Sequence, residues 1–353
     1  MIHNPNIYKT FIRPLLFLLE PEKAQSFADY FLRRSWIWES ISPMFSVNDN
    51  RLETDLCGIR LKNPIGLAAG YDKDCEMLSS FSSLGFGYVS GGTVLASPQP
   101  GNPKPRIIRY KKDHSLINSL GFPSRGIDYA RNQLEKQTQT CQVPIVVSIS
   151  GTEISNILDC LSNIEHLSDA IELNISSPNT SGLKIFQNTK ELTVLLEHVN
   201  AIRTKPLFVK LPPYSSSEHM SLNETRDRVL SLVQVCKNNG VDALTVANSQ
   251  PNKDRKLAVG MGGVSGRIIF NKTVEMVSDV RKEVGQNIAI NASGGIFDGR
   301  DALQVLKAGA STVQILTALV YRGPGIARAI NSELLNEMGK NGLPKGSESQ
   351  VIK

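Results

Sequence analysis

From residue 63 onward, eight short apolar runs alternate with stretches of helical periodicity, and this alternation limits the possible folds more than any other feature. Several runs are continuously apolar, which is typical of parallel strands buried on both faces. Eight strand–helix units in series predict an α/β fold, a (β/α)8 TIM barrel. The predicted strands are residues 64–69, 88–94, 144–149, 170–175, 206–211, 243–248, 288–292 and 312–316. Predicted helices include residues 75–84, 190–202, 223–238 and 299–307.

A doubly wound open sheet is the alternative arrangement of such units. It requires a Gly-x-Gly-x-x-Gly turn after its first strand. Residues 69–72 read Ala-Gly-Tyr-Asp and do not supply that turn. The barrel is therefore the favoured architecture.

The first 45 residues have a different pattern, which predicts an N-terminal two-helix extension of the barrel. Ile7, Phe11, Leu15 and Leu18 recur at helical spacing, and Pro21 stands where a second helix can begin. Such amphipathic helices either lie on a bilayer interface or pack on the main domain. We therefore divide the chain into a helical membrane segment (1–45), a barrel (46–340) and a polar tail (341–353).

Composition excludes several classes of protein. With 353 residues, 41% hydrophobic and 20% charged, the chain can bury a full core and is not intrinsically disordered. Its five cysteines and five histidines are scattered without CxxC, HxH or HExxH spacing, so we expect no metal site and a reducing compartment. No run of 18 apolar residues is present, so no membrane-spanning helix is expected.

The formal net charge of +6 raises the question of an anionic partner. The basic residues form no dense block and are not interleaved with aromatic residues, so we expect no nucleic-acid binding. Small anionic ligands or a lipid surface account for the charge more simply. Two long connections, residues 95–125 and 250–266, are predicted to be ordered loops that act as lids or substrate walls.

Polar residues gather where the predicted strands end, which is where barrel enzymes place their sites. Lys73 follows the first strand, and an Asn-Ile-Ser-Ser-Pro-Asn-Thr run begins at Asn174 in the fourth. Lys210 lies within an apolar strand, where a charge is costly unless an anionic partner is present. Gly295 and Thr317 follow the last two strands, and this is the usual place for a phosphate site in a barrel.

Six motifs together resemble the dihydroorotate dehydrogenase family, the FMN enzymes of pyrimidine synthesis. They lie at residues 63–73, 101–106, 117–122, 174–180, 262–266 and 294–295, in the family's order over nearly the whole chain. The N-terminal helix pair resembles that of the quinone-linked, membrane-associated class. That class uses a serine as its catalytic base, and Ser177 stands at that position.

The resemblance implies FMN-dependent oxidation of (S)-dihydroorotate to orotate, with a quinone as electron acceptor and a peripheral location on the cytoplasmic side of the membrane. Ser177 would remove the substrate's C5 proton, and Lys210 would stabilise negative charge on the reduced flavin. Arg109 would lie near the quinone path. The implied substrate contacts are Lys73, Asn118, Ser119, Leu120, Gly121, Phe122, Asn174, Asn179, Asn248 and Ser249. The implied FMN contacts are Ala69, Gly70, Tyr71, Asp72, Lys73, Thr93, Ser148, Asn174, Lys210, Ala247, Gly266, Gly295, Leu316 and Thr317.

Three departures from the quinone-linked pattern keep other functions open. Ser148-Ile-Ser-Gly-Thr-Glu153 replaces the usual Asn and Gly-Lys-Asn at the third strand, Ala247-Asn248-Ser249 replaces Thr-Asn-Thr, and Leu316 replaces a tyrosine. The run that starts at Lys210, Lys-Leu-Pro-Pro-Tyr, looks more like the soluble fumarate-linked class. One alternative is therefore a soluble-type enzyme or another flavin barrel oxidoreductase. The other is an inactive barrel protein at a membrane surface.

Overall fold

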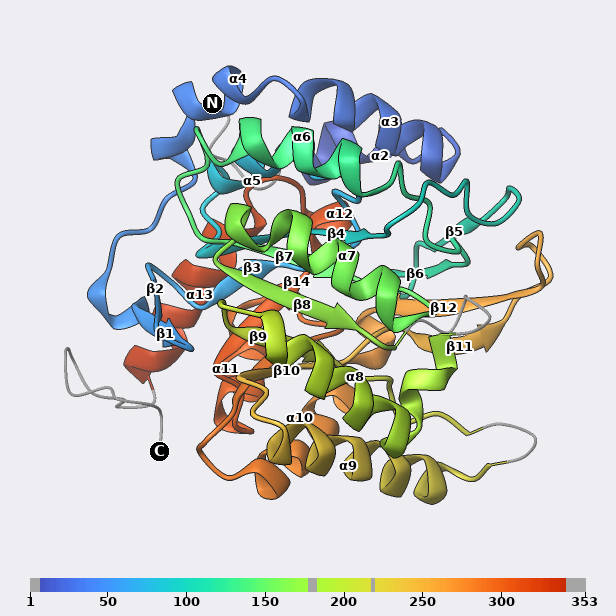
Figure 1. Cartoon of the computed structure of the whole chain (residues 1–353). Helices are drawn as coiled ribbons and strands as arrows, with labels where there is room; N and C mark the ends of the chain where they lie inside the picture. The colour runs from blue at the N-terminus through green and yellow to red at the C-terminus, as the bar shows by residue number, and fades with distance from the viewer. Residues whose placement is uncertain (1–6, 177–182, 217–219, 341–353) are drawn as a thin grey trace.

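The computed structural model describes residues 7–176, 183–216 and 220–340, and its centre is a closed barrel of parallel strands (Figure 1). All eight predicted strands are confirmed, with bounds that differ by one or two residues at most of their ends. They are β3 (Ile65–Leu67), β4 (Tyr88–Val94), β7 (Ile145–Ile149), β8 (Ala170–Asn174), β9 (Leu207–Lys210), β10 (Ala243–Val246), β13 (Ala289–Ser293) and β14 (Thr312–Ile315). Pairing of β14 with β3 closes the barrel.

Amphipathic helices surround the barrel and turn their apolar faces inward. In α8, for example, Leu192, Leu195, Leu196 and Val199 are buried on one face at helical spacing. A capping box of Ser221 and Glu224 begins α9. The outer helices are α5 (Leu78–Ser82), α6 (Ile127–Gln137), α7 (Ile154–Ile164), α8 (Thr189–Ile202), α9 (Leu222–Asn238), α10 (Phe270–Val284), α11 (Gly299–Lys307), α12 (Thr317–Arg322) and α13 (Ile326–Lys340).

A short hairpin that the sequence patterns did not predict closes the bottom of the barrel. It consists of β1 (Thr54–Leu56) and β2 (Ile59–Leu61). Leu56 and Leu61 pack against Tyr88 and Phe208, which lie at the starts of β4 and β9. Because this end is filled with apolar side chains, a ligand site must lie at the opposite end, where the strands finish.

The two long connections are not loops as predicted, but form a four-stranded antiparallel sheet. Its strands, in spatial order, are β11 (Gln250–Lys253), β12 (Met261–Gly266), β6 (Ser115–Asn118) and β5 (Ile107–Tyr110). In the central pair, Val264 lies opposite Ile117. Each connection supplies one hairpin, and the pairing between the hairpins joins segments about 150 residues apart, which local periodicity does not reveal.

The N-terminal segment contains two predicted helices and a third that was not predicted. A π-helical turn (Tyr8–Ile12) leads into α2 (Arg13–Leu16), and α3 (Pro21–Leu32) begins at Pro21 as expected. The chain leaves helical geometry at Arg34 (φ −104°, ψ 76°), so Trp36 lies on a separate short helix, α4 (Ser35–Ser40). Figure 1 shows α3 and α4 in blue at the top of the view.

Several contacts hold this segment against the barrel. Leu32 and Phe45 are buried in the main core. The Arg33 guanidinium lies 2.6 Å from the Glu76 carboxylate, and the Tyr8 hydroxyl donates to the Val320 carbonyl at 2.8 Å. The segment is therefore packed on the main domain.

Candidate active site

A cavity of about 650 Å³, which we call the strand-end cavity, lies between the carboxyl ends of the barrel strands and the N-terminal helices. Most of the residues predicted for the site line it, although they come from strand ends far apart in the sequence. These are Ala69, Gly70, Tyr71, Lys73, Thr93, Arg109, Asn118, Leu120, Gly121, Phe122, Asn174, Lys210, Ala247, Asn248, Ser249, Gly266, Gly295, Leu316 and Thr317.

Three predicted contacts lie behind the cavity wall instead. Asp72 is buried and accepts hydrogen bonds from the backbone amides of Glu76 (2.8 Å) and Met77 (2.7 Å), so it organises the turn after β3. Ser148 and Ser119 are also fully buried. Two further predicted residues, Ser177 and Asn179, lie outside the described residues.

Amide and hydroxyl groups form a connected set on one wall of the cavity. Asn174 donates to the Thr93 hydroxyl (3.0 Å) and accepts from the Ser176 hydroxyl (2.7 Å). Asn248 donates to the same Ser176 oxygen at 2.9 Å and accepts from the Ser249 backbone amide. Because each asparagine is held by its neighbours, the wall presents donors and acceptors in fixed positions, which suits a planar ring bearing amide and carboxylate groups.

Lys73 brings a cation to the cavity from the loop after β3. Its ammonium group donates to the Gly70 carbonyl at 2.6 Å. Burial lowers the pKa of Lys73, and the charge of Asp29 on α3 acts in the opposite direction. Burial also raises the pKa of Asp29 to about 6, with the nearby Arg33 and Lys73 working against that rise. The N-terminal segment thus places a carboxyl group near Lys73.

Lys210 has the anionic partner that its position within an apolar strand demands. Its ammonium nitrogen lies 3.8 Å from Oε1 of Glu172 on β8, and both side chains are buried. Sequence reasoning missed Glu172, although the same signal was present: it is a charged residue within the apolar run Ala170–Asn174.

Glycines and hydroxyls form the part of the cavity near the ends of β12, β13 and β14. Gly266 and Gly295 have φ values of +103° and +75°, which favour glycine. A Cβ on Gly295 would lie 2.6 Å from the backbone nitrogen of Phe270, so a side chain would not fit there. The Thr317 hydroxyl donates to Ser265 Oγ at 2.9 Å. This backbone-lined end of the cavity is suited to a phosphate group.

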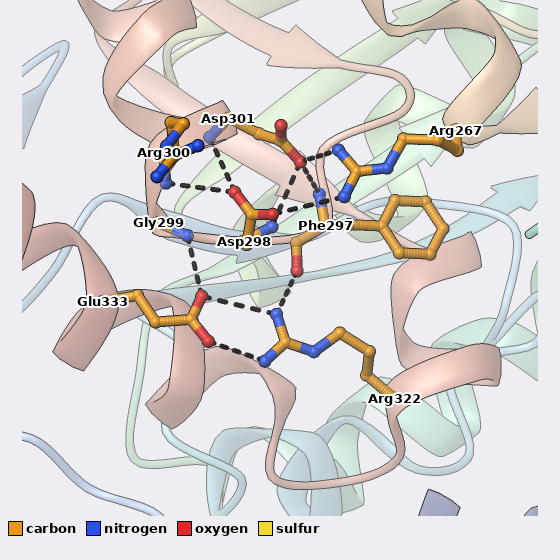
Figure 2. A network of polar contacts seen from close by, with 8 residues as sticks. All are labelled: Arg267, Phe297, Asp298, Gly299, Arg300, Asp301, Arg322 and Glu333. Atoms are coloured by element: carbon orange, nitrogen blue, oxygen red, sulfur yellow. Dashed lines mark hydrogen bonds and ion pairs between the residues drawn. The ribbon is translucent and has the colours of Figure 1, made fainter.

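Figure 2 shows a network of charged groups at the start of α11. The guanidinium of Arg267, the residue after Gly266, is paired with the carboxylates of Asp298 and Asp301. Asp301 also accepts from the Phe297 backbone amide at 2.8 Å, and Asp298 and Asp301 form the capping box of α11. The network therefore joins the segment after β12 to the one after β13.

A second arginine holds the same loop from its other side (Figure 2). Arg322, at the end of α12, donates to the Phe297 carbonyl and is paired with Glu333 at 2.7 Å. Glu333 accepts from the Gly299 backbone amide at 2.9 Å. The two arginines thus fix the loop that carries Gly295.

We expect Asp301→Ala to lower the free energy of unfolding by about 2–4 kcal/mol, because one half of the capping box of α11 is lost together with charge-assisted hydrogen bonds. The protein should also retain less cofactor, since the loop that carries Gly295 loses its support. Denaturant unfolding and cofactor content after gel filtration measure both effects. Arg300→Ala is the matched control, because Arg300 is exposed and its hydrogen bond in the network comes from its backbone amide. Equal stability of the two variants would contradict this account.

The N-terminal helices line the other end of the cavity with mainly apolar side chains, which sequence reasoning did not predict residue by residue. They include Leu16, Phe17, Ala24, Ala28 and Phe31. Only the fold shows which of the apolar residues of this segment face inward.

Arg109, which the family resemblance places near a quinone path, lines this end of the cavity. Its guanidinium stacks over the Phe17 ring, 4.5 Å from the centroid, and donates to the Leu19 carbonyl at 2.8 Å. Burial lowers the pKa of Arg109. Arg109 is thus a basic group that lines a largely apolar end of the cavity, and Lys111 lies 5.8 Å from the centroid of the same Phe17 ring.

These features define a class of protein: a (β/α)8-barrel enzyme whose ligand site lies at the strand ends and is covered by an N-terminal helical segment. Comparison with known proteins identifies the particular family. The family model for dihydroorotate dehydrogenase matches residues 51–338. The chain belongs to the dihydroorotate dehydrogenase family.

Relatives match the chain over almost its whole length. A protein of Christiangramia forsetii named dihydroorotate dehydrogenase (quinone) is 33% identical, over 94% of this chain and 99% of its own length. A protein of Bartonella henselae with the same name is also 33% identical, over 94% and 92%. The crystal structure of an Eimeria tenella DHODH in complex with ferulenol has a TM-score of 0.82 and 30% identity, and the match covers 91% of this chain and 92% of that one.

Proposed function

We propose that this protein oxidises dihydroorotate to orotate in pyrimidine biosynthesis and passes the electrons to a quinone. One observation carries this proposal: a single cavity joins a wall of fixed amides and hydroxyls at the strand ends to an apolar end beneath the N-terminal helices. A polar heterocyclic substrate fits the first part and an apolar acceptor fits the second. The relatives named dihydroorotate dehydrogenase (quinone) support the same assignment.

Membership of the family implies a flavin, and we propose that it is FMN. The glycine-lined end near β12, β13 and β14 would hold its phosphate, with Gly266, Gly295 and Thr317 as contacts. Lys73 and Lys210 would lie against the ring, together with Ala69, Gly70, Thr93 and Leu316. We keep Tyr71, Asp72, Ser148, Asn174 and Ala247 as further proposed FMN contacts, although Asp72 and Ser148 would act from behind the wall.

The bound flavin supplies the acceptor for the hydride from dihydroorotate. In the proposed mechanism, Asn118, Asn174, Asn179, Asn248 and Ser249 hold the ring amides and carboxylate of the substrate. The loop of residues 119–122 and Lys73 complete the substrate site. Ser177 accepts the C5 proton, and its hydroxyl needs polarising neighbours because serine is a weak base. Lys210 places positive charge where negative charge develops on reduction.

For the acceptor, we propose that the quinone enters between α2 and α3 and passes Arg109. We also propose that residues 1–45 attach the protein to the cytoplasmic side of the membrane as a peripheral protein, that residues 46–340 form the FMN barrel and that residues 341–353 are a polar tail. Phe11 (66% exposed), Leu15 (67%), Leu18 (81%) and Trp36 (68%) support membrane contact, because all four are large apolar residues on the N-terminal segment. Among the described helices, none is long and apolar enough to cross a membrane.

Two half-reactions test the proposed function on the full-length protein. Dihydroorotate should bleach the bound flavin in the absence of oxygen, and a quinone should restore its colour. Fumarate is the comparison acceptor. Rapid reoxidation by fumarate but not by quinone would favour a soluble-type enzyme, and a protein without flavin would favour the inactive barrel.

We expect the purified protein to be yellow and to release FMN on denaturation. The proposed phosphate site needs to hold one phosphate, and the sequence contains no dinucleotide-binding fingerprint after its first strand. Mass spectrometry of the released cofactor makes the measurement. Release of FAD would contradict the assignment of the glycine-lined end.

A further inference from the structure

The interior of the barrel, directly below the strand-end cavity, contains a carboxylate that the proposed mechanism does not use. Glu172 has a relative exposure of 0%. It lies two residues before Asn174 on β8, so both side chains point to the same side of the strand. Asn174 lines the cavity and Glu172 lies one layer deeper. A carboxylate this deeply buried needs strong compensation for its lost hydration.

A chain of hydrogen bonds across the barrel supplies part of this compensation. The Thr245 hydroxyl donates to Glu172 Oε2 at 2.8 Å, and Asn291 Nδ2 donates to the Thr245 oxygen at 3.4 Å. On its other side, Asn291 Oδ1 accepts from the Thr312 hydroxyl at 2.6 Å. The Tyr88 hydroxyl lies 3.0 Å from Thr312 Oγ1. These groups come from β4, β14, β13, β10 and β8, so the chain crosses the barrel.

The donor and acceptor of each hydrogen bond can be assigned along the whole chain. A hydroxyl has one proton, and that of Thr312 is used on Asn291, so Tyr88 must donate to Thr312. Every bond in the chain therefore donates toward Glu172. Glu172 Oε2 is therefore the final acceptor of the chain.

The other oxygen of Glu172 faces Lys210. Oε1 lies 3.8 Å from the ammonium nitrogen, which is within ion-pair distance but too long for a hydrogen bond. Oε1 has no hydrogen-bond partner among the described residues. Glu172, one layer deeper in the barrel, therefore balances the charge of Lys210. It does not accept a hydrogen bond from the Lys210 ammonium. No hydrogen bond from the Lys210 ammonium to another described residue is present, and Lys210 lines the cavity, so its donors can meet a group bound there.

We propose that Glu172 is a positioning residue that neutralises the Lys210 ammonium below the flavin ring, and that this ion pair sets the reduction potential of the bound flavin. This inference rests on the proposed function, because it takes the flavin ring to lie against Lys210. Negative charge on a reduced ring would compete with Glu172 for the Lys210 ammonium. Glu172 thus limits how strongly Lys210 favours the reduced state.

The first measurement is the reduction potential of the flavin in the intact holoenzyme, taken at pH 6.5 by equilibration with a reference dye. In Glu172→Gln the floor of the cavity gains net positive charge. The ratio of reduced to oxidised flavin at a fixed solution potential should rise at least about tenfold, which is about 30 mV for a two-electron couple. Lys210→Met should lower this ratio, and the double variant should return close to the wild type.

The second measurement is thermal unfolding of the same proteins without flavin, which does not depend on the redox chemistry. Each single variant leaves one buried charge without its partner, and the double variant leaves none. The double variant should therefore unfold at a higher temperature than Glu172→Gln. Tyr88→Phe is the matched control, because it removes the far end of the hydrogen-bond chain but no charge. It should lower the unfolding temperature and leave the flavin ratio within about twofold of the wild type.

Two results would overturn the inference alone: a flavin-containing Glu172→Gln protein whose ratio is unchanged or lower, or two single variants whose effects on unfolding simply add. A full-length protein that takes up no flavin would overturn the proposed function and this inference together. The two failures are therefore distinguishable by the colour of the purified protein.

Discussion

Ser177→Ala is expected to slow the reduction of bound flavin by dihydroorotate by about 10²–10⁴-fold, the usual contribution of a positioned base. This corresponds to about 2.7–5.4 kcal/mol of transition-state stabilisation, at 1.36 kcal/mol for each factor of ten. Alanine removes the hydroxyl that would accept the C5 proton, and it leaves the proposed flavin contacts unchanged. Anaerobic stopped-flow measurement of flavin bleaching isolates this step.

Two controls belong to this experiment. The flavin content and the rate of reoxidation by quinone should equal those of the wild type, because neither involves the C5 proton. Ser177→Cys keeps a group that can accept a proton and should react faster than Ser177→Ala. A loss of less than about threefold in Ser177→Ala would show that another group is the base.

Ala28→Trp is expected to lower the rate of flavin reoxidation by quinone by about 10²-fold or more, because misplacement of a reactant by about 1 Å can cost that much. Ala28 lies on α3 and lines the apolar end of the strand-end cavity. An indole there would occupy the proposed path of the acceptor. Reduction of the flavin by dihydroorotate should be unchanged, since the proposed substrate contacts lie at the strand ends.

Ser26→Trp is the matched control for this variant. Ser26 is an exposed residue of the same helix and does not line the cavity, so the same side chain there should leave both half-reactions at the wild-type rate. Full quinone turnover in Ala28→Trp would show that the acceptor reaches the flavin by another route. Deletion of residues 1–45 is a less specific test, because it also removes Leu32 and Phe45 from the main core.

Comparison of particular residues shows how far local patterns carry the prediction of a site. Lys210 was recognised because a charge within an apolar strand is costly, and its partner Glu172 satisfies the same argument. Asp72 was predicted as a cofactor contact from its place in a motif. In the structure its carboxylate accepts hydrogen bonds from the backbone amides of Glu76 and Met77. A motif identifies the segment near a site, but hydrogen bonding decides which of its side chains remain available.

The amino-acid sequence by itself determined the barrel, since each of its eight strands is a short apolar run whose burial is visible locally. It also determined the family, and it marked most of the residues that line the cavity. Only the tertiary structure decided that residues 95–125 and 250–266 join in one sheet, that Glu172 lies below Lys210, and that Leu16, Ala24 and Ala28 face the cavity. The physical reason is that these features depend on contacts between segments far apart in the chain, and local periodicity has no information about the partner of a strand, a charge or a helix face.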